Sequence, residues 1–321
     1  MVLTKRNSIR CVVILVAVFI IGEIGSRYFL GLGTPLLYMP HPRIEYMLKP
    51  NQNIHRLGKH FFVNQYGMRS EPFVGKKGGL RMMVFGDSVV NGGNSTDQKD
   101  LATSLLRNWI IKEGYKELVV GNISAGSWGP GNWLAYAKEY GFFDADIIIL
   151  VISSHDYIDN PTFAPFANAH PIKRPVSALL YGFTRYFYPS LIKMITRNNI
   201  RKPVQPTNDM VTEAEAKKGL SDLKEFLRLA KKEAKNILVF QYLTQTEITS
   251  FTTMPGYQRI KDVCEESDIK PVSLEPYFRK SLEKGINPYQ DDIHPNVSGQ
   301  RNIAEAVMEN LLMDAFLYKS I

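Results

Sequence analysis

The sequence predicts an α/β fold, a three-layer α/β/α sandwich with a central parallel sheet. The first observation behind this prediction is that short apolar runs alternate with longer amphipathic runs from residue 81 onward. Such alternation is the pattern of strands joined by helices that cover both faces of one sheet. The second observation is that residues 147–152 are continuously apolar, as expected of a strand covered on both faces.

A membrane anchor is predicted at the N-terminus. Residues 11–22 form an apolar run of 12 residues, the length of a signal-peptide core, whereas a membrane span needs about 20. Three basic side chains precede the run: Lys5, Arg6 and Arg10. Such residues keep the N-terminus cytoplasmic and export the rest of the chain. We therefore expect a cytoplasmic basic tail at 1–10 and a transmembrane anchor or signal at 11–32.

Two charged residues decide whether this segment can span a membrane. Glu23 and Arg27 lie four apart, so they can pair on a helix and extend the run to about Leu32. A signal-cleavage site requires small residues at two flanking positions, and the residues around Gly22 do not meet this requirement. Residues 31–33 meet it better but lie far beyond the apolar run. The sequence therefore favours an uncleaved single-pass anchor over a cleaved signal, with the remaining chain periplasmic or extracellular.

Residues 33–78 are predicted to form an extracytoplasmic arm that packs on the main domain. Prolines punctuate its beginning, at positions 35, 40, 42 and 50. The run His60–Val63 predicts a short strand, and Asn64 and Gly67 after it supply turn-forming residues. No chemistry is assigned to this arm.

Residues 79–321 carry the α/β domain. Strands are expected at 81–86, 118–122, 146–152, 236–243 and 270–274, and helices at 101–113, 130–140, 212–235, 256–267 and 297–317. Neither Cys11 nor Cys264 has a plausible disulfide partner, and no Cys/His cluster has zinc spacing. No phosphate-binding GxxxxGK[ST] loop is present either, so no metal or cofactor is expected.

The turn Gly86-Asp87-Ser88 is the first candidate site. It follows the apolar run 81–85 and precedes an amphipathic run from Leu101. A strand, a tight turn and a helix lift a serine to the carboxyl edge of a parallel sheet, where sites in α/β folds form. An ordinary Gly-Asp-Ser turn without chemistry is the alternative, because short motifs also match by chance.

The second candidate stretch lies near the C-terminus, at Asp291-Asp292-Ile293-His294. Asp291 and His294 are three residues apart, so the carboxylate can reach back to the imidazole. An imidazole beside a serine can take its proton during attack and return it to the leaving group. A carboxylate on the far ring nitrogen fixes the tautomer and stabilises the imidazolium.

Together the two stretches resemble the GDSL, or SGNH, hydrolase family over roughly residues 79–318. The resemblance implies a flavodoxin-like SGNH hydrolase fold in a membrane-anchored member. It also implies that Ser88 is the nucleophile, His294 the base and Asp291 the orienting acid. Asp87 is then part of the turn and not the acid of the triad.

The resemblance further implies an oxyanion site made of the backbone N–H groups of Ser88 and Gly126, with Gly129 as the alternative glycine. The family usually has Gly-x-Asn-Asp after the third strand, whereas this chain has Ser153-Ser154-His155-Asp156. A neutral imidazole can donate one N–H, so His155 either replaces the asparagine amide or is purely structural.

An insertion at 160–208 is basic and aromatic. It contains no acidic residue and seven basic ones: Lys173, Arg174, Arg185, Lys193, Arg197, Arg201 and Lys202. Three interpretations stay open: a membrane-surface segment, a site for an anionic glycan, and a packed cap with a solvated rim. Predicted export argues against nucleic acid as a partner.

These observations predict a serine esterase that hydrolyses O-acyl esters by a Ser-His-Asp acyl-enzyme mechanism. The expected substrate is an acylated carbohydrate of the envelope or an exopolysaccharide, or another small ester. One alternative is an O-acyltransferase with the same triad and a sugar hydroxyl as acceptor. Another is a non-catalytic glycan-binding or assembly component with the same fold. The acyl group, the acceptor and the oligomeric state do not follow from the sequence.

Overall fold

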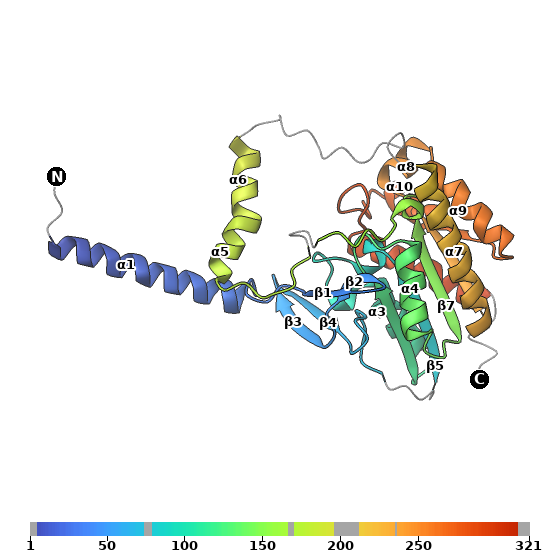
Figure 1. Cartoon of the computed structure of the whole chain (residues 1–321), viewed down its shortest axis with the longest axis horizontal. Coiled ribbons are helices and arrows are strands. Elements are labelled where there is room, and N and C mark those ends of the chain that lie inside the picture. The colour runs from blue at the N-terminus through green and yellow to red at the C-terminus, as the bar shows by residue number, and fades with distance from the viewer. Residues whose placement is uncertain (1–4, 74–78, 166–169, 196–211, 235, 314–321) are drawn as a thin grey trace.

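The computed structural model describes residues 5–73, 79–165, 170–195, 212–234 and 236–313 (Figure 1). Five parallel strands form the central sheet. In spatial order they are β6 (Leu118–Ser124), β5 (Leu80–Gly86), β7 (Ile147–Ser153), β8 (Asn236–Tyr242) and β9 (Val272–Ser273). This order is the doubly wound 2-1-3-4-5 arrangement, which places the carboxyl ends of all strands at one edge.

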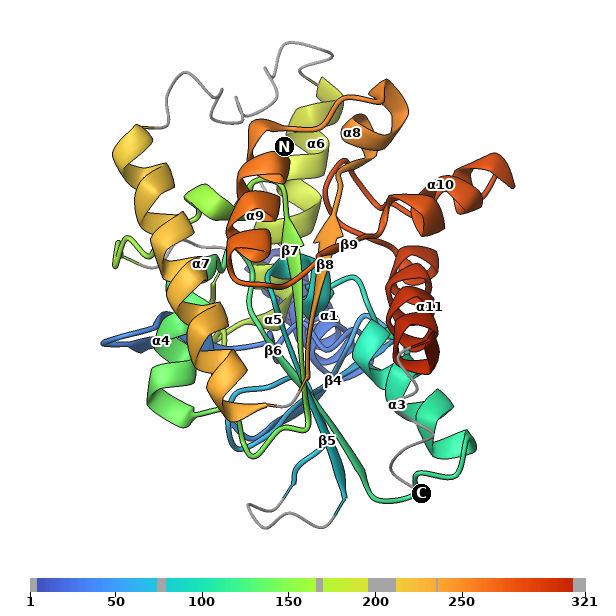
Figure 2. The same cartoon turned by 90° about the vertical axis from the view of Figure 1, so that its right-hand side faces the viewer.

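Helices cover both faces of this sheet, which confirms the predicted α/β/α sandwich (Figure 2). The helices of one face are α3 (Ala102–Lys112) and α11 (Val297–Met313), and those of the other are α4 (Pro130–Tyr140), α7 (Glu213–Glu233) and α9 (Pro255–Glu266). Successive strand residues alternate between the faces. Met82 and Val84 pack toward α3 and α11, whereas Met83 and Phe85 pack toward α4 and α7.

The short helices that follow β8 and β9 are among the elements that were not predicted. They are α8 (Gln245–Ser250) and α10 (Glu275–Glu283). Helix α8 begins with a reciprocal cap between Thr244 and Glu247. Cys264 is buried in α9 and Cys11 is exposed near the N-terminus; both are free, as expected. The end of the predicted last helix, residues 314–317, lies outside the described residues.

The arm contains four strands where one was predicted. They are β1 (Tyr38–His41), β2 (Glu45–Leu48), β3 (Gln52–Arg56) and β4 (Lys59–Val63), paired as two antiparallel hairpins. Tyr46 and Met47 belong to the same hydrophobic core as the sheet and α4. The arm therefore packs on the main domain as expected.

Arg69 connects the arm to the main domain and is fully buried. Its guanidinium donates to the carbonyl oxygens of Asn91 (2.7 Å), Gly93 (3.0 Å) and Thr96 (3.0 Å), and it lies over the Phe61 ring at 4.8 Å. Burial lowers the pKa of Arg69 to about 10, so the group is still charged at neutral pH. One arm residue thus fixes the segment that follows Ser88.

The N-terminal segment forms α1 (Lys5–Ile24) and a single turn of π-helix, η1 (Gly25–Phe29), which project from the domain (Figure 1). Residues 6–29 are long and apolar enough to cross a membrane, with a mean hydropathy of 2.3 and nothing buried in the most apolar window. A core helix or a signal sequence can meet the same criterion. Glu23 and Arg27 pair as expected, with the Arg27 Nε donating to Glu23 at 3.0 Å.

Replacing Arg69 tests how far the fold depends on this connection. Arg69→Met leaves three buried carbonyl oxygens without a donor, so we expect a loss of about 3 kcal/mol or more and a Tm lower by roughly 5–10 °C. Arg69→Lys should recover part of the loss because it keeps the charge. The measurement is thermal unfolding of the full chain in detergent, with Arg228→Met on exposed α7 as the control that should change little. Equal Tm values for the Arg69→Met variant and the parent would contradict this role.

Candidate active site

Ser88 occupies the first position of a short helix at the carboxyl edge of the sheet. Strand β5 ends at Gly86, Asp87 caps α2 (Ser88–Asn91), and the Asp87 carboxylate accepts from the Val89 N–H at 2.8 Å. A Cβ on Gly86 would lie 2.3 Å from the Val90 side chain, so the tight turn requires glycine there. The turn holds Ser88 half-buried at the edge of the sheet.

Side chains from distant segments hold the backbone of this turn. Each of four carbonyl oxygens accepts from a buried donor: Gly86 from Trp133 (2.9 Å), Val89 from Gln300 (2.7 Å), Val90 from Asn122 (3.0 Å) and Asn91 from Arg69 (2.7 Å). Buried carbonyl groups are costly unless they are paired, so each donor stabilises this one backbone geometry. The backbone on both sides of Ser88 is therefore held in one rigid conformation.

Asp291 and His294 are in direct contact. The Asp291 carboxylate lies 2.8 and 3.0 Å from Nδ1 of His294 and also accepts from the backbone N–H of His294 (2.8 Å) and of Ile293 (2.9 Å). Burial alone would raise the pKa of Asp291, but these hydrogen bonds outweigh it and hold the pKa below its usual value. An ionised Asp291 keeps the proton on Nδ1, which leaves Nε2 of His294 as the basic nitrogen.

Several contacts bring the His294 loop to the serine edge. Tyr242, at the end of β8, donates to the Ile293 carbonyl at 2.6 Å, and Gln300, just beyond His294, reaches the turn at Val89. Burial raises the pKa of the Asp87 carboxyl, and His155 and, to a smaller extent, His294 act to lower it. Among the described residues no hydrogen bond joins Ser88 to His294; the Ser88 Oγ lies 3.4 Å from Asp87 Oδ2. Catalytic hydrogen bonds often tighten only when substrate is present.

The backbone N–H groups of Ser88 and Gly126 are the candidate oxyanion donors. Ser88 begins α2, and the first N–H groups of a helix have no partner within it. Tyr46 of the arm donates to the Gly126 carbonyl at 2.5 Å, which fixes the Gly126–Ser127 peptide, the one directly after the N–H of Gly126. The N–H of Gly129, the alternative, already donates to the Asn132 side chain at 3.0 Å. Gly126 is therefore the better candidate of the two glycines.

His155 lies beside the serine turn in a buried acidic cluster. Its Nε2 is 3.5 Å from Asp156 Oδ1 and 3.9 Å from Asp87 Oδ2, the same oxygen that the Ser88 hydroxyl approaches. The other oxygen of Asp156 accepts from the Ser153 N–H at 2.7 Å. His155 and Ser88 thus converge on one carboxylate oxygen, and the His155 ring is only 23% exposed.

Burial raises the pKa of each carboxyl in this cluster. The pKa of Asp156 lies well above its usual value because of burial and the neighbouring Asp87, and burial raises the pKa of Asp159 to about 6. Asp87, His155 and Asp156 each bring a possible metal-ligand atom within 4.8 Å of the others. Because the pKa of each carboxyl is raised, protons shared between these groups are favoured in this cluster. Sequence reasoning gave no role to Asp156 or Asp159, because their effect depends on burial.

A pocket of about 340 Å³ lies next to Gly126. The arm forms one wall with Glu45 and Tyr46, and the insertion after β7 forms another with Asp159 and His170. The Tyr46 and His170 rings are 4.7 Å apart, and burial lowers the pKa of His170, so its imidazole is neutral. Glu45 accepts from the N–H groups of Thr162 (3.0 Å) and Phe163 (2.9 Å), which fixes the insertion against the arm. A larger cavity, of about 500 Å³, lies between the arm and α3; neither its lining nor that of the smaller pocket includes a candidate catalytic residue.

Comparison with known proteins gives no matching family model and no matching curated protein. Among solved structures, an α/β hydrolase from the metagenome of Lake Arreo in Spain has 14% identity and a TM-score of 0.46, with 74% of this chain and 97% of that one covered. An acetyl xylan esterase, AlAXEase, has 12% identity and a TM-score of 0.47, with coverages of 72% and 100%. A lipolytic G-D-S-L family protein from Veillonella parvula has 12% identity and a TM-score of 0.42, with coverages of 72% and 97%. All three are distant likenesses.

Proposed function

We propose that this protein is a serine esterase of the GDSL/SGNH type that hydrolyses O-acyl esters. The observation that carries the proposal is the Asp291–His294 pair, held at the same sheet edge as Ser88 at the start of α2. The basic Nε2 of His294 and the serine hydroxyl are the two groups that acyl transfer requires. The nearby backbone N–H groups of Ser88 and Gly126 supply the third requirement, a site for the oxyanion.

The proposed reaction has two half-reactions. Ser88 Oγ attacks the acyl carbonyl while His294 Nε2 takes its proton, and the resulting oxyanion is held by the N–H groups of Ser88 and Gly126 and by His155. His294 then protonates the leaving alcohol oxygen as the ester C–O bond breaks. Water, deprotonated by His294, attacks the acyl-enzyme, and the carboxylic acid leaves with Ser88 reprotonated. Asp291 stabilises the imidazolium throughout.

The pocket beside Gly126 supports an acylated carbohydrate as the substrate. It combines two rings, Tyr46 and His170, with the carboxyl groups of Glu45 and Asp159. Specific ligand sites usually combine such apolar faces with a few placed polar groups. Sugar rings present both apolar faces and many hydroxyls, so they suit this lining. An envelope glycan or an exopolysaccharide fits a catalytic domain placed outside the cytoplasm.

The N-terminal helix is proposed to be an uncleaved anchor, with the catalytic domain extracytoplasmic. Arg27 donates to the carbonyl of Val176 at 2.7 Å, and Leu32 is buried. Cleavage after Gly33 would remove both residues and their contacts with the domain, so these contacts argue against that cleavage site. The basic residues before the helix favour a cytoplasmic N-terminus.

The nucleophile can be tested by covalent labelling. Ser88 should react with an organophosphonate fluoride because His294 activates it. Ser88→Ala should abolish both labelling, read by mass spectrometry, and hydrolysis of acetylated oligosaccharides. Ser250→Ala, at an exposed serine of α8, is the matched control and should behave like the parent. Labelling that persists in the Ser88→Ala variant would refute the assignment, and acetyl transfer to an added glycan would indicate the transferase alternative.

The role of His155 can be tested with two substitutions. A donor to the oxyanion acts as charge develops, so His155→Ala should lower kcat by roughly a hundredfold or more with little change in KM. His155→Asn should recover much of the loss, because an amide can donate from the same place. A structural histidine predicts instead a lower Tm, no catalytic recovery with asparagine, and a nearly normal kcat per folded molecule.

The anchor makes a prediction about the mature chain. Protein extracted from membranes with detergent should retain its N-terminal residues, as read by intact mass and N-terminal sequencing. It should also resist extraction by high salt or alkaline carbonate. A mature chain that begins after Gly22 or after Gly33 would show that the segment is a cleaved signal.

A further inference from the structure

The insertion after β7 contains a helical segment with one exposed apolar face. The segment consists of α5 (Ala178–Gly182), a π-helical turn η4 (Phe183–Phe187) and α6 (Tyr188–Ile195). Four large apolar side chains share helical spacing and are between 47% and 70% exposed: Leu180, Phe183, Phe187 and Met194. The Phe183 and Phe187 rings lie together, with centroids 5.3 Å apart. Exposure of such an apolar stripe to water is unfavourable, so we expect it to contact another apolar surface.

The opposite face of the segment is bound to the arm. Arg56 of β3 is only 3% exposed and lies over the rings of Tyr181, at 5.3 Å, and Tyr186, at 5.7 Å. Gly182 packs against Leu32 so closely that a Cβ would lie 2.5 Å from the leucine side chain. The segment is therefore held on one side by protein, and its apolar stripe faces outward.

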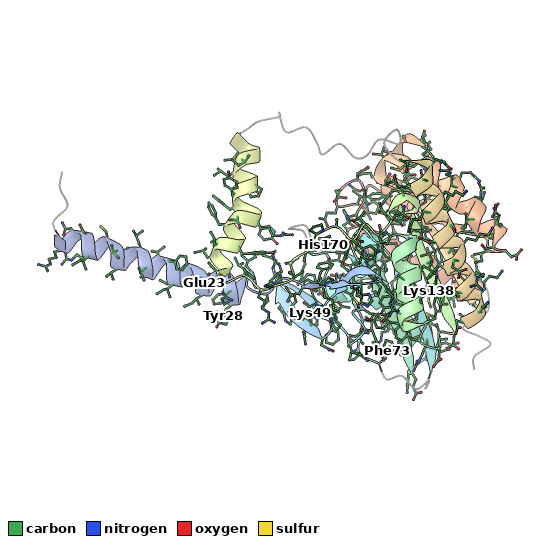
Figure 3. All side chains as sticks on the ribbon, viewed as in Figure 1. Glu23, Tyr28, Lys49, Phe73, Lys138 and His170 are labelled. Atoms are coloured by element: carbon green, nitrogen blue, oxygen red, sulfur yellow. The ribbon has the colours of Figure 1, made fainter. Side chains whose placement is uncertain are left out.

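A polar joint fixes this segment to the end of α1. The Glu23 carboxylate accepts from the Ser177 hydroxyl at 2.8 Å and from the N–H groups of Ala178 and Leu179, both at 2.9 Å. It thereby caps the first turn of α5, where N–H groups have no helical partner. Glu23 and Tyr28 are labelled at this junction in Figure 3.

The segment runs across the direction of α1. In Figure 1, α6 stands transverse to α1, and in Figure 2, where α1 is seen nearly end-on, α6 again runs across it. If α1 crosses a bilayer, a helix so placed at its end lies along the bilayer surface. Tyr28 and Phe29, at the end of the apolar helix, are 78% and 84% exposed, as in the aromatic belts of membrane proteins.

We propose that α5, η4 and α6 form an interfacial helix that lies in the headgroup layer of the bilayer crossed by α1, with Phe183 and Phe187 in contact with the acyl chains. This inference rests on the proposed anchor and does not depend on the esterase reaction. Lys173 and Arg174, exposed just before α5, are placed to meet lipid phosphates. The side chain of Lys193, and all of Arg197, Arg201 and Lys202, lie outside what the structure describes.

The depth of single residues in a bilayer tests this proposal. The full chain, with Cys11 replaced by alanine and Cys264 left buried, is reconstituted in phosphatidylcholine–phosphatidylglycerol nanodiscs. A fluorescent bimane is attached to Phe187→Cys, and quenching by lipids with a nitroxide near the headgroup is measured. We expect strong quenching by this lipid at position 187 and none at Ser250→Cys on the catalytic domain; Leu15→Cys, the reference in the middle of α1, should be quenched strongly by a second lipid with its nitroxide deep in the acyl chain.

The outcomes separate this proposal from the others. Quenching at Leu15→Cys without quenching at Phe187→Cys overturns the interfacial helix and leaves the anchor standing. Quenching at neither position would refute both the interfacial helix and the membrane anchor. Ester hydrolysis by the same samples reports on the esterase assignment independently of either result.

A second pair of variants tests whether the apolar face causes the contact. Phe183→Asp should reduce quenching at Met194→Cys, because a carboxylate on the apolar face opposes its insertion. Ile286→Asp, at an exposed apolar residue of the catalytic domain, is the matched control and should leave quenching unchanged. Undiminished quenching in the Phe183→Asp variant would contradict insertion through this face.

Discussion

The arrangement of the candidate site depends on the burial of one positive charge, that of Arg69. A guanidinium removed from water must find acceptors for its N–H groups, and here the carbonyls of Asn91, Gly93 and Thr96 provide them. These carbonyls belong to the segment that leaves the nucleophile helix. The arm is therefore part of the framework of the site, although it contributes none of the proposed triad. Tyr46 of the arm acts in a similar way: it holds the carbonyl of Gly126, which belongs to the peptide next to the one that carries the Gly126 N–H.

Local patterns predicted most of the fold. Continuous apolar strands located β5 and β7, and the three-residue spacing of Asp291 and His294 gave a contact that the structure contains. The arm was harder to predict, since β1 to β3 are short and carry little periodicity. The raised pKa values of Asp156 and Asp159 could not be foreseen, because they arise from burial by segments far apart in sequence. The packing of Arg56 over the rings of Tyr181 and Tyr186 could not be predicted either, because Arg56 is far from both tyrosines in the sequence.

The surroundings of Ser88 differ in character from those of His294. The serine turn is held by buried donors on all sides, whereas the His294 and Asp291 side chains are 43% and 53% exposed. A rigid nucleophile opposite a more open base gives a substrate room to enter from the solvent side. Burial raises the pKa of the Asp87 carboxyl beside Ser88, and the two histidines, His155 and His294, act to lower it. The protonation state of the buried acids is thus coupled to the site where acyl transfer is proposed.

The cap that Glu23 places on α5 also has a consequence for biosynthesis. The two partners are separated by more than 150 residues, so α1 is synthesised long before the segment that it receives. During that interval Arg27, four residues further on, can already pair with the Glu23 carboxylate, and the first two strands of the sheet can already pair. Contacts between distant segments form late because closing a long loop is entropically costly. Attachment of the insertion to the anchor then follows pairing of the first two strands, and the contact of Gln300 with the nucleophile turn, which closes a still longer loop, forms later.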